Sequence, residues 1–146
     1  MDMFYENGMM FGREKDTQAY QGKMERFELE FQKVKDVIPE ILRLKEDCEN
    51  YKDANSIHSF NHFIETLTDN QLITLRAIYF CRRDSFNKPI DKGIKRNDFI
   101  KECVLTMESL NDFYDKEINR RDRADFCTKK LRCLKDAFLL ALDVIK

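Results

Sequence analysis

The sequence predicts an all-α protein: a compact bundle of about five helices with an irregular apolar N-terminal arm. The strongest indication comes from residues 98–146, which contain no Gly and no Pro. Their apolar residues recur at steps of three and four, which places an apolar stripe along one side of a helix. Only four Gly and two Pro occur in all 146 residues, too few for the frequent turns of a β-rich fold.

The predicted arm covers residues 1–19, and residues 20–146 are predicted to form a single helical domain. Most terminal segments are polar, whereas this one is rich in Met and aromatic residues around Gly8 and Gly12. One interpretation is that the arm folds back over a groove in its own bundle. The other is that it docks on a partner or a second copy, because Met and aromatic side chains suit adaptable contact surfaces. The candidate partner-binding residues are Phe4, Tyr5, Met9, Met10 and Phe11.

The first helix is predicted over residues 22–53, starting near Gly22. Its apolar residues keep helical spacing from Met24 onward. Pro39 lies inside this run, and an interior proline removes a hydrogen bond and clashes with the preceding turn. We therefore expect a kink or short break there, or a new helix that has Pro39 at its first position.

Two further helices are predicted over residues 57–67 and 69–83. Between them, Thr68-Asp69-Asn70-Gln71 matches a capping box, in which the Thr hydroxyl and the Gln side chain satisfy each other's backbone N–H groups. Residues 72–81 are apolar nearly all round. Such a helix is one that its neighbours surround, so residues 69–83 are predicted to lie at the centre of the bundle.

Residues 84–97 form the clearest predicted loop, since they contain Pro89 and Gly93. Asn97 is a candidate N-cap for the next helix. The last two helices are predicted over 98–119 and 122–145. The charged run at 117–123 is either a tight turn between them or the solvated middle of one long helix, and we favour the turn because it lets both stripes be buried.

Charge and cysteine content restrict the class of protein. The formal net charge is −1, whereas nucleic-acid-binding domains usually carry a clear basic excess. Five Cys is an odd number, and most of them occupy core positions of the helical pattern, which predicts reduced thiols in the cytoplasm. No secretory signal or stretch of about 18 apolar residues is evident.

Few residues suggest catalysis or a cofactor, and neither a catalytic residue nor a cofactor is predicted. His58 and His62 are spaced i, i+4 and could share a metal. A third ligand such as Glu65 or Cys48 would have to come from elsewhere, and two surface histidines are the simpler interpretation. A Cys nucleophile would need one of these histidines as its base, and no local motif supports that pairing. Glycine-rich phosphate-binding loops are absent from the sequence.

Basic residues around the loop and the 120–132 region suggest an alternative function. They could contact nucleic acid or an acidic partner if the two regions met on one face, although acids lie close to every cluster. The candidate contact residues are Arg82, Arg83, Lys92, Lys95, Arg96, Arg120 and Arg121.

The stretch Phe63-Ile64-Glu65-Thr66-Leu67-Thr68-Asp69-Asn70-Gln71-Leu72, continuing through Arg82-Arg83-Asp84, resembles the centre of a family of short bacterial proteins of unknown function. In that family a helix ends at a polar cap, and an apolar helix follows and closes on an Arg-Gly or Arg-Asp turn. Here Cys81-Arg82 replaces the small residue or Gly expected before Arg-Asp. The resemblance covers about a quarter of the chain, carries no activity, and implies a cytoplasmic helical domain.

These observations lead to an interaction protein rather than an enzyme as the main hypothesis. The chain is expected to bind and regulate or inhibit a larger protein assembly, as small proteins of phages and other mobile elements commonly do. The alternative is a nucleic-acid-binding accessory protein, and a third is a metal-binding enzyme centred on His58 and His62. A homodimer is compatible with the apolar arm, because an isologous contact buries both arms at once.

Overall fold

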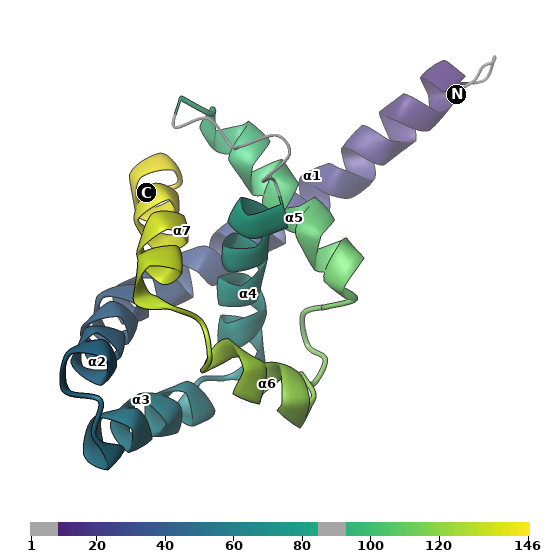
Figure 1. Cartoon of the computed structure of the whole chain (residues 1–146). Helices are drawn as coiled ribbons and strands as arrows, with labels where there is room; N and C mark the ends of the chain where they lie inside the picture. Colours follow the sequence, from purple (N-terminus) through teal and green to yellow (C-terminus); the bar gives the residue numbers. More distant parts are fainter. Residues whose placement is uncertain (1–8, 85–92) are drawn as a thin grey trace.

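Helix α4 (Asp69–Asp84) runs through the middle of the protein, and three of the other helices pack around it (Figure 1). Every residue from 72 to 79 is buried. A helix of this kind needs neighbours on most sides. Helix α4 contacts α1 (Met9–Val34), α5 (Arg96–Leu110) and α7 (Leu131–Val144). The predicted central position of residues 69–83 is therefore confirmed.

The computed structural model describes the backbone of residues 9–84 and 93–146, and the side chains of residues 19–83 and 93–146. These residues form seven α-helices and one 3₁₀ helix and include no strand, which confirms the predicted all-α bundle. In chain order the elements are α1 (Met9–Val34), η1 (Lys35–Val37), α2 (Ile38–Tyr51), α3 (Ala54–Thr66), α4, α5 (Arg96–Leu110), α6 (Arg120–Phe126) and α7 (Leu131–Val144).

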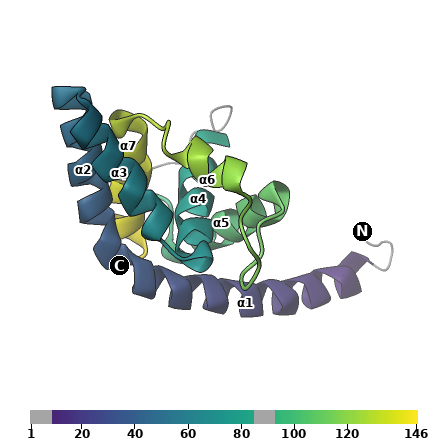
Figure 2. The same cartoon turned by 90° about the horizontal axis from the view of Figure 1, so that it is seen from below.

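The first predicted helix is two helices separated by η1, where the chain changes direction (Figure 2). Pro39 lies at the start of α2, where its missing N–H needs no helical partner. The expected break is thus confirmed. Helix α1 begins at Met9 rather than near Gly22, because the strong helix formers among residues 13–19 outweigh the helix-weakening effect of Gly12.

The junction between α3 and α4 is the predicted capping box. The Gln71 N–H donates to Thr68 Oγ1 at 3.1 Å, and the Thr68 N–H donates to Gln71 Oε1 at 2.9 Å. Helix α3 begins earlier than expected, because the Asp53 side chain accepts from the Ser56 N–H and acts as its N-cap.

The last part of the chain differs from the expectation of two helices over 98–119 and 122–145. Helix α5 ends at Leu110, where Asn111 adopts the left-handed conformation with φ 60°. Residues 111–119 are non-helical, and a second interruption at 127–130 separates α6 from α7. The region therefore holds three helices. Asn97 does not cap α5 either, since Lys95 occupies that position and makes no side-chain capping bond.

Phenylalanine dominates the core, as the lack of Trp suggests. Six Phe side chains from five helices are almost completely inaccessible, and burying each contributes roughly 1.5–3 kcal/mol. They are Phe27, Phe31, Phe60, Phe99, Phe126 and Phe138. The rings of Phe126 and Phe138 stack with centroids 6.3 Å apart, which joins α6 to α7 despite the break between them.

Candidate functional site

The N-terminal part of α1 projects beyond the other helices (Figures 1 and 2). Tyr20 marks the point where α1 joins the bundle, because its hydroxyl donates to Glu108 on α5 at 3.0 Å. Met9, Met10 and Phe11 lie in the first turn of α1, at the projecting end, and their side chains are outside the described part. Phe4 and Tyr5 lie outside the described residues altogether.

An apolar groove, here called the α1–α5 groove, lies beside the point where α1 joins the bundle. It has a volume of about 230 Å³. Val104 and Met107 of α5 are buried in it, whereas Phe113 is 48% exposed. The lining residues are Lys23, Arg26, Val104, Met107, Glu108, Asp112, Phe113 and Tyr114.

Charged residues form one edge of this groove. Lys23 pairs with Glu108, and this hydrogen bond raises the pKa of Lys23 and lowers that of Glu108. The Arg26 guanidinium lies 5.0 Å from the centroid of the Tyr114 ring, a favourable cation–π distance. The groove thus combines an apolar floor with a polar, partly basic rim, which is a common composition for a protein-binding surface.

The predicted basic residues do not gather on one face. Arg82 and Arg83 lie in the last turn of α4, whereas Arg120 and Arg121 open α6, beside the first turn of α4. Arg123 fixes that position, because it donates to Asp69 Oδ1 at 2.9 Å. With a rise of about 1.5 Å per residue, residues 69 and 82 are about 20 Å apart along α4.

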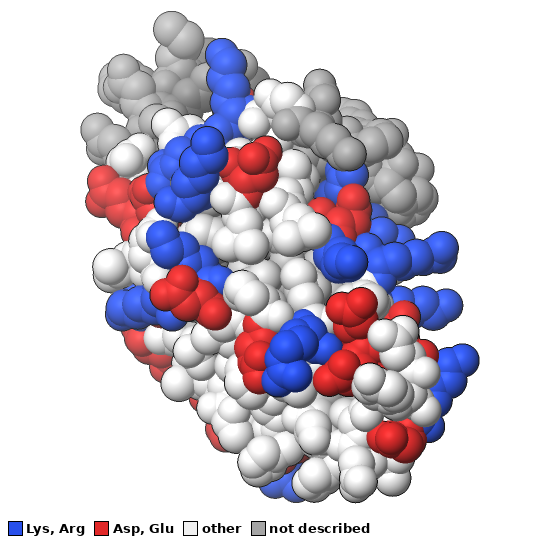
Figure 3. Space-filling model, turned by 90° about the vertical axis from the view of Figure 1, so that its left-hand side faces the viewer, with Lys and Arg blue, Asp and Glu red and all other residues white. Residues whose placement is uncertain are grey.

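Several of these bases are already used within the chain. Arg82 pairs with Asp136 at 2.8 Å, and Arg96 pairs with Glu28 and donates to the Ile145 carbonyl at 2.9 Å. Arg83, Lys95, Arg120 and Arg121 are exposed, and Lys92 lies outside the described residues. One face of the molecule shows acidic and basic side chains interspersed rather than a continuous basic surface (Figure 3).

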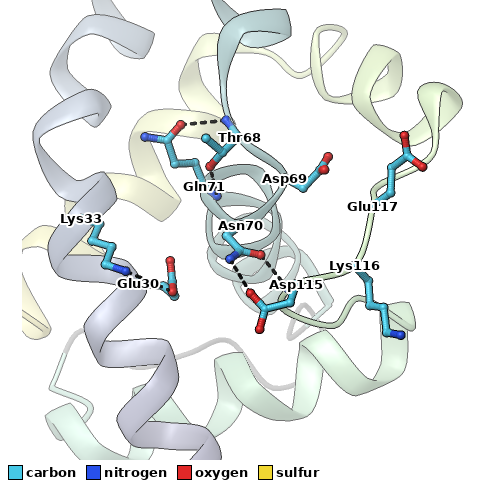
Figure 4. A pocket seen from close by; sticks show the side chains of 9 residues that line it. All are labelled: Glu30, Lys33, Thr68, Asp69, Asn70, Gln71, Asp115, Lys116 and Glu117. Carbon is cyan, nitrogen blue, oxygen red and sulfur yellow. Dashed lines mark hydrogen bonds and ion pairs between the residues drawn. The ribbon is translucent and has the colours of Figure 1, made fainter.

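A polar pocket of about 670 Å³ lies between α1, the start of α4 and the 111–119 segment (Figure 4). Asp115 accepts two hydrogen bonds from Arg26, at 3.0 and 3.1 Å, and one from Asn70 at 3.2 Å. These bonds lower the pKa of Asp115, with the Arg26 contribution the largest. The side chains of Lys116 and Glu117 point away from the network (Figure 4). These hydrogen bonds fasten the 111–119 segment to α1 and α4.

His58 and His62 lie side by side on α3, with ring centroids 5.9 Å apart. Both are exposed. Across the described residues, no group of three or more His, Cys, Asp or Glu side chains is placed to hold a metal ion. Among the residues that the structure describes, the pair therefore has no additional ligands of the kind that a protein zinc site uses.

All five cysteines are free. Cys81 and Cys103 are buried, and Cys48, Cys127 and Cys133 pack against the core, as the helical pattern predicts. Burial raises the pKa of the Cys48, Cys103 and Cys127 thiols. Since the thiolate is the nucleophile, these environments disfavour reactivity.

Comparison with protein-family models, curated proteins and solved structures finds no match to this chain. The resemblance of residues 63–84 therefore stays a prediction. None of the helices in the described ranges combines the length and apolar character required to cross a membrane.

Proposed function

We propose that this chain is a non-enzymatic helical interaction protein of the cytoplasm that binds and regulates or inhibits a larger protein assembly. The projecting end of α1 is its principal contact element. The observation that supports this most is that α1 continues for eleven residues beyond Tyr20, away from the bundle (Figure 2).

The sequence of this projection suits docking. Residues 12–19, GREKDTQA, contain no large apolar side chain, and they separate Tyr20 from Met9, Met10 and Phe11. The projection is thus a polar helical stalk with an apolar tip. Apolar anchors on a helix are a recurring means of binding to a groove on another protein, and Met adapts readily to irregular surfaces.

Affinity capture from lysate of the native host, with and without nuclease, tests this proposal. The full chain is compared with a variant lacking residues 1–12 and with a double variant, Met10→Gln and Phe11→Gln. We expect a stoichiometric protein partner that survives nuclease and is lost with both variants, because removing central anchors typically weakens binding by about 2 kcal/mol or more.

The matched control is Leu139→Gln, which removes a 48% exposed apolar side chain from α7 instead. It should retain the partner, and circular dichroism should show all variants folded. Retained binding by the arm variants would remove the arm from the proposal. Partners that disappear with nuclease would favour the nucleic-acid alternative through residues such as Arg83 and Arg120.

A further inference from the structure

We propose that the free protein forms a two-fold dimer in which the α1 helices run antiparallel and each apolar tip enters the α1–α5 groove of the other copy. This inference goes beyond the proposed function, since the occupant of the groove is a second copy of the chain. A larger assembly would then bind α1 in exchange for that copy.

The length of α1 determines which tip can reach the groove. Because α1 is one continuous helix from Met9 to Val34, Phe11 and Lys23 are held about 18 Å apart along its axis. The tip of one chain therefore cannot enter its own groove. An antiparallel second α1, in a register that places Phe11 opposite Lys23, brings each tip to the groove of the other copy. Two-fold symmetry makes the same contact twice.

The groove suits this occupant in polarity. Its floor offers Val104 and Met107, and the half-exposed Phe113 ring provides further apolar surface for a Met or Phe side chain.

The charged groups at the rim are paired within the chain, Lys23 with Glu108 and Arg26 with Asp115. An occupant therefore gains its contact with the groove from the apolar floor, which a Met or Phe side chain suits.

Gly22 separately supports the packing of two α1 helices against each other. Glycine weakens a helix interior relative to alanine, so its presence in the middle of α1 needs a reason. Packing within one chain does not require a glycine there, because no atom of another described element lies within 4 Å of the position that a Cβ would occupy. In the proposed register Gly22 faces Gly12 of the other copy, and the two glycines allow the helices to approach closely.

Light scattering of the purified full chain over a range of concentrations tests the dimer. The wild type should approach twice its 17.5 kDa chain mass. Gly22→Gln should be monomeric under the same conditions although glutamine favours the helix, and Phe113→Gln should be weakened too. The control is Gln32→Ala, at an exposed position of α1 outside the part that the second α1 would contact. This variant should remain dimeric.

The register is tested by cross-linking. A Phe11→Cys chain mixed with a Lys23→Cys chain should give a specific cross-linked pair with a short bismaleimide, whereas Phe11→Cys mixed with Gln32→Cys should give only the background of the native thiols. A wild type that stays monomeric throughout, or a Gly22→Gln variant that dimerises like the wild type, would overturn the proposal. Either result concerns the pure protein, so capture of a host partner remains a separate test of function.

Discussion

Arg76 and Asp112 form an ion pair inside the bundle, with 3.0 Å between Nε and Oδ2 and side-chain exposures of 5% and 7%. Burial raises the pKa of Asp112, and the hydrogen bond from Arg76 acts in the opposite direction. The pair joins the middle of α4 to the start of the 111–119 segment. It explains how a charged residue can lie within the most buried helix of the protein.

Asp112→Ala should destabilise the protein strongly, because it leaves the buried Arg76 charge with only the longer pair to Asp122, at 3.8 Å. Removing one member of a buried pair typically costs about 3–5 kcal/mol. Urea unfolding followed by circular dichroism measures the change, with Asp143→Ala on exposed α7 surface as the control. A loss below about 1 kcal/mol, the usual scale of an exposed pair, would contradict this account.

Arg123→Lys should also destabilise the protein, even though the charge is kept. The guanidinium donates from Nη1 to the carbonyls of Ile64 and Leu67, at 2.8 and 2.9 Å, and from Nη2 to Asp69 at 2.9 Å. Lysine cannot reproduce this planar arrangement of donors. We expect a loss of roughly 1–3 kcal/mol in thermal or urea unfolding, whereas Arg121→Lys at the exposed neighbouring position should have no measurable effect.

Thr68→Ala removes half of the capping box at the start of α4. The Gln71 N–H then loses its acceptor, and the expected loss is about 1 kcal/mol. The control is Thr106→Ala on α5, where the hydroxyl donates to the Glu102 carbonyl in the helix interior at 2.8 Å. Since alanine favours a helix interior, this control should be neutral or stabilising, and equal losses in both variants would argue against the capping role.

The stability gained from Asp115 should depend on pH. Hydrogen bonds from Arg26 and Asn70 hold its pKa below the usual range, so the unfolded chain takes up the proton first as pH falls. The contribution is complete above the unfolded pKa of about 3.9 and is lost as pH falls through the lower folded value. Urea unfolding from pH 6 down to pH 3 should show a decreasing difference in the free energy of unfolding between the wild type and Asp115→Asn. A difference that does not depend on pH, or an equal decrease for Glu117→Gln, would contradict this account.

The sequence predicted the features that local chemistry determines. The capping box at Thr68 and the central position of α4 both follow from a few neighbouring residues. Arg76 was not singled out in the sequence, although a charge within the apolar run 72–81 needs an acidic partner once it is buried. Which acid that is depends on the path of the 111–119 segment, and spacing alone cannot supply it.

The C-terminal third shows where periodicity fails. Tyr114 and Ile118 fit the helical spacing, yet they lie in a non-helical segment. Apolar spacing indicates which residues are buried, but it does not determine the conformation of the backbone that carries them. Two asparagines mark the helix boundaries that the apolar spacing does not indicate. Asn111 readily adopts the left-handed conformation that ends α5, and the Asn119 side chain accepts from the Asp122 N–H at 2.7 Å to begin α6.

The helical conformation of residues 9–19 was not predicted, for a related reason. Gly8 and Gly12 suggested irregular structure, although the polar residues that follow are good helix formers. What no local pattern could indicate is that this helix leaves the bundle at Tyr20.

Helix α7 follows the other described helices in the chain and covers part of α4. Its buried residues Leu134, Phe138 and Ala141 contribute to the core, and it packs against α4 and α2. During translation, the apolar surface of α4 therefore emerges from the ribosome well before the helix that covers it. A nascent chain, or one truncated before Leu131, exposes that surface to other chains and is therefore prone to aggregate.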